Sequence, residues 1–148
     1  YVEFPSLDEL DEIMNRTISK QAPTVERVMS REELESLRDV ATKVAIAPTM
    51  QRYALKILQR THPGFEEAPD EVKRYVREGA SPRGGQAILS AARVHALMRG
   101  EPMVAEEDVL ACVVPALRHR VILNFEGEAE GVDKDELIET IVRRTPRA

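Results

Sequence analysis

The sequence predicts an all-α domain of six or seven helices, with at most a short extended segment or a minor strand pair. Apolar residues recur at three- and four-residue spacings through most of the chain, which is the period of an amphipathic helix. Ser, Asp or Pro stands where several of these stretches begin, as is typical of helix starts. A length of 148 residues, with 43% hydrophobic and 32% charged residues, suits one folded core.

Two capping boxes open the first two helices. Ser6 with Glu9, and Ser30 with Glu33, have the spacing at which side chains and backbone N–H groups bond one another reciprocally. The first helix should extend to about Ser19. The apolar stripes are Leu7, Leu10, Ile13, Met14 and Ile18 in the first helix, and Leu34, Leu37, Ala41 and Val44 in the second.

Residues 45–47 look extended, and Pro48 then opens a third helix. Prolines and a glycine between His62 and Asp70 predict a loop. A short helix over residues 70–77 should follow it. The apolar stripe of the third helix is Met50, Tyr53, Ala54, Ile57, Leu58 and Thr61.

The fourth long helix begins after a turn rich in glycine. Ser81 is a suitable N-cap, Pro82 suits the first helical position, and Gly100 ends the helix after Arg99. Arg83 then lies in the first turn, where a cation is unfavourable by roughly 0.3–1 kcal/mol because of the helix dipole. An anion bound beside Arg83 would reverse that sign.

The local charge supports an anionic ligand for this turn. Residues 72–99 carry six basic residues against the single acid Glu78, in a chain whose net charge is −5. Because a helix N-terminus also favours negative charge, the sequence predicts a phosphate-type ligand at Arg83. The basic residues are Lys73, Arg74, Arg77, Arg83, Arg93 and Arg99.

The C-terminal third should hold two further helical regions. An acidic first turn at residues 106–108 begins the first of them, and Pro115 should break or kink it near Ala111, with a second piece to about His119. Residues 121–125 look extended, and residues 126–131 look like a loop because they hold two glycines. Asp133 and Glu136 then cap the last helix, which ends in Arg143 and Arg144.

Several classes of function are excluded or disfavoured by the residues. The single Cys112 excludes an internal disulfide framework and fits a reducing, cytoplasmic setting. No apolar run approaches the ~20 residues of a membrane span. The chain starts at Tyr1 without a signal-peptide layout, so it reads as a piece of a longer protein. The acidic net charge speaks against nucleic acid as a partner.

No catalytic or metal-binding motif is present in the sequence. The histidines share no metal-ligand spacing with one another or with Cys112, so we expect no metal site. A phosphate-binding loop and the common hydrolase motifs are also missing. Arg118 and Arg120 close a helix C-terminus, where basic residues are expected, and a phosphate or subunit contact is the alternative interpretation.

Several separated motifs together resemble the C-terminal part of MoxR-type AAA+ ATPases, over nearly the whole chain. The opening residues 1–5 look like the end of the last strand of the AAA+ core, and residues 6–148 like the helical lid. The motifs are Asp70-Glu71-Val72-Lys73-Arg74-Tyr75-Val76-Arg77-Glu78-Gly79-Ala80-Ser81-Pro82-Arg83, Leu97-Met98-Arg99-Gly100, Glu107-Asp108-Val109, Leu117-Arg118-His119-Arg120 and Phe125-Glu126-Gly127-Glu128-Ala129-Glu130-Gly131-Val132.

This resemblance implies that Arg83, in Ser81-Pro82-Arg83, is the sensor-2 arginine that contacts the γ-phosphate of ATP. It also implies that the full-length protein uses ATP and Mg²⁺ through its own AAA+ core, where the phosphate-binding loop would lie. The family further implies a chaperone-like, homo-oligomeric, hexameric ring and a partner with a von Willebrand factor A domain. The fragment alone should therefore not hydrolyse ATP.

The sequence departs from the family pattern at three places. Glu78 stands where the family often has an aromatic residue before Gly79, which implies different packing on the adenine side. Gly84 and Gly85 stand in a first helical turn that usually carries Ala, and Ala105 occupies a cap position that Thr or Ser commonly fills. Two alternatives remain: a helical module that binds a peptide, with Arg83 merely exposed, and a helical nucleic-acid-binding domain that uses residues 72–99.

Overall fold

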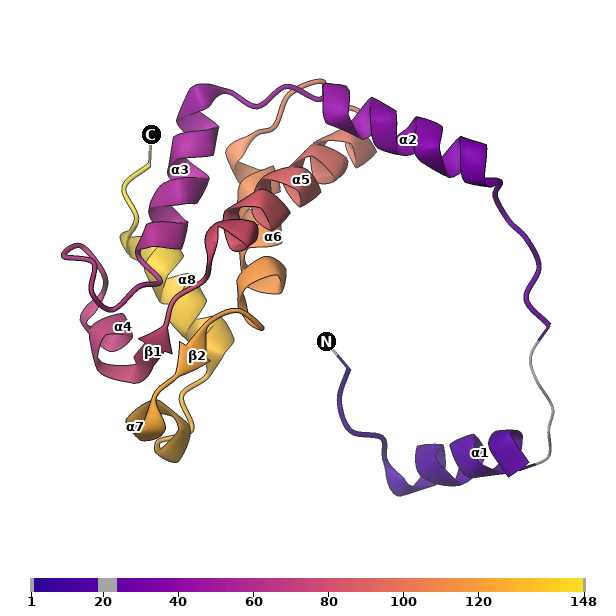
Figure 1. Ribbon diagram of the computed structural model, residues 1–148, viewed down its shortest axis with the longest axis horizontal. Coiled ribbons are helices and arrows are strands. Elements are labelled where there is room, and N and C mark those ends of the chain that lie inside the picture. Colours follow the sequence, from indigo (N-terminus) through magenta and orange to yellow (C-terminus); the bar gives the residue numbers. More distant parts are fainter. Residues whose placement is uncertain (1, 19–23, 148) are drawn as a thin grey trace. The chain divides into compact units, whose positions relative to one another are not determined.

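The computed structural model describes residues 2–18 and 24–147 (Figure 1). The chain divides into two compact units, Tyr1–Leu34 and Glu35–Ala148. The described part contains eight helices and one two-stranded sheet. In chain order the elements are α1 (Leu7–Ile18), α2 (Arg31–Lys43), α3 (Pro48–Gln59), α4 (Asp70–Tyr75), β1 (Val76–Glu78), α5 (Pro82–Met98), α6 (Glu106–Leu117), β2 (Ile122–Leu123), α7 (Phe125–Ala129) and α8 (Lys134–Arg144).

Both predicted capping boxes are confirmed. The Ser6 N–H donates to the Glu9 carboxylate (2.7 Å), and the Ser30 N–H donates to that of Glu33 (2.7 Å). These bonds favour the charged carboxylates, so they lower the pKa of Glu9 and of Glu33. The predicted end of the first helix, Ser19, lies outside the described residues. Residues 2–4 carry no regular secondary structure.

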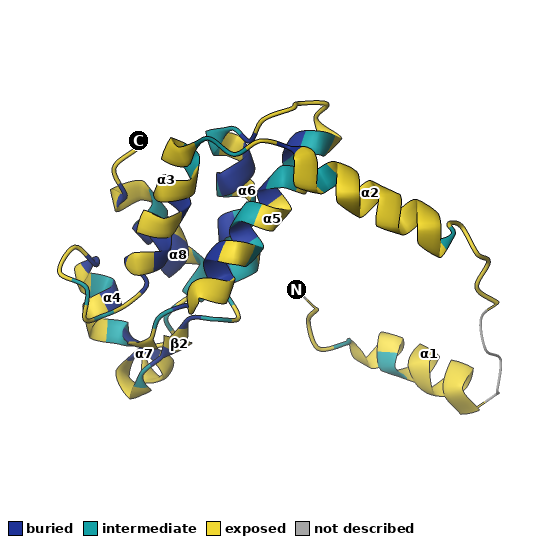
Figure 2. Ribbon diagram, turned by 45° about the horizontal axis from the view of Figure 1, so that its top comes forward, coloured by how far each residue is buried: buried dark blue, intermediate teal, exposed yellow. Residues whose placement is uncertain are grey.

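The core lies in the C-terminal unit, where α5 packs against α6 and α3, and α6 packs against α8. Figure 2 shows buried faces on these four helices, whereas α1 and α2 contain no buried residue. Small side chains on α5 (Ala92 and Ala96, both 0% exposed) allow neighbouring helices to approach closely. The large side chains with 0% exposure are Ile57, Ile88, Val72, Val109, Val113, Leu117, Ile138 and Ile141, so the core is aliphatic as expected from the scarcity of aromatics.

Two short pairings connect segments that are distant in the sequence. β1 is antiparallel to β2, with Val76 opposite Leu123, which confirms the expected minor strand pair. The predicted extended segment before α3 forms a parallel bridge between Ala45 and Met103. In that bridge the Ala45 N–H donates to the Pro102 carbonyl (3.0 Å).

Two sequence predictions are wrong in detail. α6 continues through Pro115 to Leu117, instead of breaking near Ala111. Proline removes the N–H that would bond the Ala111 carbonyl, but Ala111 is exposed, so water can bond that carbonyl. Val113 and Leu117, both 0% exposed, hold the last turn in the core.

The predicted loop over residues 126–131 contains a helix, α7. The Asn124 side chain caps this helix by accepting from the Gly127 N–H (2.9 Å). Gly127 is a packing glycine, because a Cβ there would lie 2.9 Å from the Tyr75 carbonyl oxygen. The glycine that suggested a loop therefore marks a close contact between α7 and α4.

Candidate functional site

The N-terminus of α5 begins as the sequence predicts, at Pro82 with Ser81 as the N-cap residue. The Ser81 hydroxyl makes no capping hydrogen bond. The Ser81 backbone carbonyl accepts from the Gly84 N–H (2.7 Å), which tightens the first turn. At the other end of the helix Gly100 adopts a positive φ of 79°, as expected of a glycine that follows a helix.

Arg83 lies exposed in this first turn. Within residues 2–18 and 24–147 its guanidinium forms no hydrogen bond or ion pair. An exposed guanidinium without a protein partner keeps all five of its N–H donors free for a ligand. The side chain is therefore neither sealed in the bundle nor used to hold the bundle together.

Four of the six basic side chains of residues 72–99 have a bonding partner in the fold, and three of these four are paired with acidic side chains. Two of the six basic side chains, Arg83 and Arg93, have no partner among the described residues, and the buried Nε of Arg93 lacks an acceptor there. The other four are bonded as follows: Lys73 to the Glu66 carbonyl (2.8 Å), Arg74 to Glu126 (2.6 Å) and Glu130 (2.9 Å), Arg77 to Glu78 (3.5 Å), and Arg99 to Asp108 (2.9 Å).

The turn before Arg83 is fixed by residues at the end of α3. Ala80 is fully buried; its N–H donates to Thr61 Oγ1 (2.9 Å), and its carbonyl accepts from His62 Nε2 (3.0 Å). Neither Thr61 nor His62 is among the residues predicted for the site. Both bonds span 18 or 19 residues, and no periodicity or motif in the sequence indicates them.

Gly84 and Gly85 are both buried in close contacts with α3 and α6. A Cβ on Gly84 would lie 3.0 Å from Leu117 Cδ2 and 3.1 Å from Leu58 Cδ1. A Cβ on Gly85 would lie 3.3 Å from Leu55 and Leu58. The glycine pair therefore lets the first turn of α5 seat tightly against its neighbours.

The far end of α5 is joined to α6 through Asp108, which is 0% exposed. Its carboxylate accepts from Arg99 Nε and Nη2 (both 2.9 Å), from His95 Nδ1 (2.7 Å) and from the Ala105 N–H (2.7 Å). The Arg99 hydrogen bonds are the largest cause that holds the Asp108 pKa well below its usual range. Asp108 is the N3 residue of α6, and its bond to the Ala105 N–H is the half of a capping box that an alanine at the N-cap still permits.

Arg118 and Arg120 have partners inside the domain. Arg118 Nε donates to Asp135 Oδ1 (2.9 Å), and the pair is bidentate. Arg120 Nε donates to the Ala116 carbonyl (2.9 Å). The Arg118 bonds tie the end of α6 to α8, and the Arg120 bond returns to α6 itself. A phosphate or subunit contact at either arginine stays a prediction.

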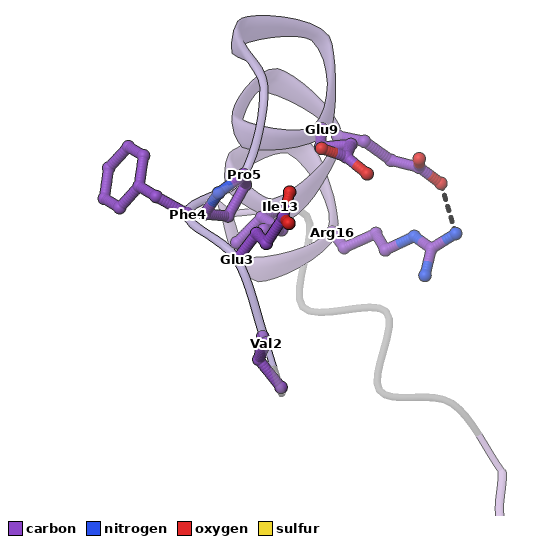
Figure 3. Close-up of a pocket in the computed structure, with 8 residues that line it drawn as sticks. Val2, Glu3, Phe4, Pro5, Glu9, Ile13 and Arg16 are labelled. Carbon is purple, nitrogen blue, oxygen red and sulfur yellow. Dashed lines mark hydrogen bonds and ion pairs between the residues drawn. The ribbon is translucent and has the colours of Figure 1, made fainter. Parts of the chain in front are cut away.

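Three hollows on the described surface are lined by residues other than Arg83. One, of about 530 Å³, lies in the N-terminal unit beside α1, and Figure 3 shows the ring of Phe4 directed away from Ile13 and Arg16. Two others, of about 390 Å³ each, involve α4 and α8.

The described residues contain no group of three or more His, Cys, Asp or Glu side chains that could hold a metal ion, and none of their helices is long and apolar enough to cross a membrane.

Comparison with known proteins relates the chain to one family. The family model of the AAA lid domain matches residues 70–141. Chaperone MoxR1 of Mycobacterium tuberculosis is 28% identical over 142 residues, which cover 96% of this chain and 37% of that protein. Protein MoxR of Paracoccus denitrificans is 30% identical over 82 residues, which cover 53% of this chain and 24% of that protein.

A solved structure agrees with these relatives. A protein of Cytophaga hutchinsonii, described provisionally as an ATPase, has a TM-score of 0.79 and 26% sequence identity. The similarity covers 99% of this chain and 45% of that one. The chain thus spans less than half the length of these proteins.

Proposed function

Because this chain carries an AAA lid domain over residues 70–141 and is homologous to the MoxR chaperones, we propose that it is the lid of a MoxR-type AAA+ ATPase. We propose further that Arg83 is its sensor-2 arginine, which contacts the γ-phosphate of ATP bound by the AAA+ core. The observation that carries this proposal is the exposed guanidinium of Arg83, without a protein partner among the described residues, in the first turn of α5.

The chemistry of the turn suits a phosphate. A guanidinium donates two parallel hydrogen bonds to phosphate oxygens, and each charge-assisted bond is stronger than a neutral one. The positive end of the α5 dipole adds to the attraction, so the turn that is unfavourable for Arg83 alone becomes favourable with the anion present. As phosphoryl transfer spreads charge over the γ-phosphate oxygens, Arg83 would stabilise that charge.

The remaining parts of the ATPase site belong to other segments in this proposal. The described residues contain no group of His, Cys, Asp or Glu side chains that could hold a metal ion. In this proposal the AAA+ core binds Mg²⁺ and contains the phosphate-binding loop. Contact between Arg83 and the γ-phosphate would then link the nucleotide state to the angle between lid and core. Ser81, whose hydroxyl makes no capping bond, lies close enough in sequence to contribute a phosphate contact.

The assembly is part of the same proposal. We propose that the full-length protein acts in the cytoplasm as a chaperone-like, hexameric ring and engages a partner with a von Willebrand factor A domain. The relative named Chaperone MoxR1 supports the chaperone role. The strongly exposed Val2, Phe4 and Leu7 (95%, 87% and 81%) fit a segment that packs against the AAA+ core in the intact protein.

The test compares the affinities of the full-length protein for ATP and ADP. Replacing Arg83→Ala should weaken ATP binding about tenfold and leave ADP binding nearly unchanged, because only ATP offers a γ-phosphate. The matched control is Arg77→Ala, an arginine whose side chain is 62% exposed and which precedes the turn. Equal loss of ATP and ADP affinity, or no loss, would refute the sensor-2 assignment.

The peptide-binding module remains the rival function. The hollows described above are lined by other residues, as a module in which Arg83 is merely exposed would have them. In the proposed ATPase the nucleotide cleft forms only when lid and core meet, so the lid alone need not have a hollow at Arg83. An Arg83→Ala protein that binds and hydrolyses ATP like the natural protein would favour the rival.

A further inference from the structure

We propose that Thr61 and His62 are positioning residues for Arg83, and that together they set the direction in which its guanidinium reaches the nucleotide. This inference rests on the proposed sensor-2 role and adds residues that the sequence does not indicate. Since Arg83 has no protein partner among the described residues, its direction depends on the backbone that precedes it. The contacts that fix this backbone therefore decide the direction of the guanidinium.

Ala80, three residues before Arg83, is held at both of its backbone groups. Its N–H donates to Thr61 Oγ1 (2.9 Å), and its carbonyl accepts from the Nε2–H of His62 (3.0 Å). Thr61 and His62 are consecutive residues, the second and third after the end of α3. The turn is thus clamped to the end of α3 by side chains that bond backbone groups on both sides of one residue.

The Thr61 hydroxyl both accepts and donates a hydrogen bond. It accepts from the Ala80 N–H and donates to the Leu58 carbonyl (2.7 Å), and the residue is 0% exposed. The Leu58 carbonyl also accepts from the Thr61 N–H (3.1 Å), so Thr61 is held to α3 through its backbone as well as its side chain. The bond to Ala80 therefore has a fixed direction, as a positioning contact requires.

The contact is also close enough to exclude any side chain on the preceding residue. A Cβ on Gly79 would lie 2.7 Å from the Thr61 carbonyl oxygen and 2.7 Å from His62 Cγ. The φ of Gly79 is not in the left-handed region, so glycine is needed for space rather than for conformation. Backbone packs on backbone here, which leaves the turn little room to shift.

The first turn of α5 transmits this position to Arg83. The Gly84 N–H bonds the Ser81 carbonyl, and Gly84 itself packs against Leu58 and Leu117. Residues 80–84 therefore behave as one rigid segment with Arg83 projecting from it. A displacement of Ala80 would move the guanidinium by a similar amount, and misplacement on the scale of an ångström lowers reaction rates strongly.

The experiment measures steady-state ATP hydrolysis by the full-length protein. Thr61→Val keeps the shape of the side chain but removes the hydroxyl, so kcat should fall roughly two- to tenfold, as expected for one lost hydrogen bond. Thr61→Ser restores the hydroxyl and should restore kcat to within about twofold. Thr145→Val is the matched control, because this buried hydroxyl also bonds a backbone carbonyl (Ile141, 2.7 Å) but lies at the end of α8.

A double-mutant cycle separates positioning from a general loss of stability. In an Arg83→Ala background, Thr61→Val should have almost no further effect on kcat, because there is no guanidinium left to position. Equal losses in both backgrounds, or no loss in either, would overturn the inference. If Arg83→Ala by itself leaves turnover unchanged, the proposed function fails instead, so the two failures are distinguishable.

A second variant and a second readout cover the case in which Thr61→Val does not fold. His62 is exposed, so His62→Ala should leave the core intact but lower kcat, whereas His62→Gln keeps a donor for the Ala80 carbonyl and should retain it. Amide hydrogen exchange of the 148-residue chain should show faster exchange at Ala80 in Thr61→Val and unchanged exchange in Thr145→Val. Unchanged exchange at Ala80 would contradict the clamp.

Discussion

At the scale of single residues, the molecule distinguishes charges that hold the fold from charges that are free to act. Asp108 is fully buried and accepts hydrogen bonds from Arg99, His95 and the Ala105 backbone. Its charge is therefore paired inside the domain. Arg83 is exposed and has no partner among the described residues. Arg99, which bonds Asp108, and Arg83 therefore have opposite roles, although they belong to the same basic stretch.

We predict that Asp108→Asn lowers the free energy of unfolding of the 148-residue chain by about 3 kcal/mol at pH 7. The neutral side chain leaves Arg99 without its buried counter-charge. Glu107→Gln is the control: Glu107 also pairs with Arg99 (2.6 Å), but its side chain is 64% exposed, so the loss should be below about 1 kcal/mol. Urea denaturation measures both values, and equal losses would contradict a special role for Asp108.

The same variant has a pH signature. Because Arg99 lowers the folded-state pKa of Asp108, the unfolded chain takes up the proton first as the solution is acidified. The stabilisation is therefore complete above the ordinary Asp pKa and is lost progressively below it. The difference in unfolding free energy between the natural chain and Asp108→Asn should shrink as pH falls below about 4.

At the scale of elements, the start of α5 is defined by its contacts with α3. Ser81 and Pro82 mark the start in the sequence, but the hydroxyl of Ser81 makes no capping bond. The turn is instead placed by Thr61 and by the space that Gly79 leaves. Local signals locate the helix along the chain, and tertiary contacts orient it.

Gly79→Ala should therefore destabilise the chain by about 1–3 kcal/mol, because the new Cβ would overlap the Thr61 carbonyl and force the turn to move. Gly64→Ala is the matched control. A Cβ at Gly64 would meet nothing within 4 Å, so this substitution should be neutral or stabilise by up to about 1 kcal/mol. Thermal unfolding of the two variants tests the difference. A Gly79→Ala chain as stable as Gly64→Ala would show that the close approach is not required.

What the sequence predicts well at this scale is local. Ser30 and Glu33 are three residues apart, and the hydrogen bonds that they predict form. What it misses is a contact between elements: Gly127 was interpreted as a loop residue, because its close approach to Tyr75 joins segments 52 positions apart. The bonds of Thr61 and His62 to Ala80 were missed for the same reason.

At the scale of the whole molecule, the fold and its relatives agree on a lid. The all-α architecture follows from helical periodicity and is confirmed, and so is the minor strand pair expected beside the helices. The AAA lid match over residues 70–141 contains Arg83 and the α5–α6 core that supports it. The sensor-2 role needs a nucleotide on a neighbouring AAA+ core, and for that reason neither the sequence nor the fold of this chain tests it.

The most direct test is the turnover number for ATP hydrolysis by the full-length protein with Arg83→Ala, beside Arg77→Ala. If Arg83 binds the γ-phosphate, kcat should fall at least about tenfold in Arg83→Ala and stay unchanged in Arg77→Ala. Circular dichroism should show that both variants are folded. An Arg83→Ala protein that hydrolyses ATP at the natural rate would contradict the account.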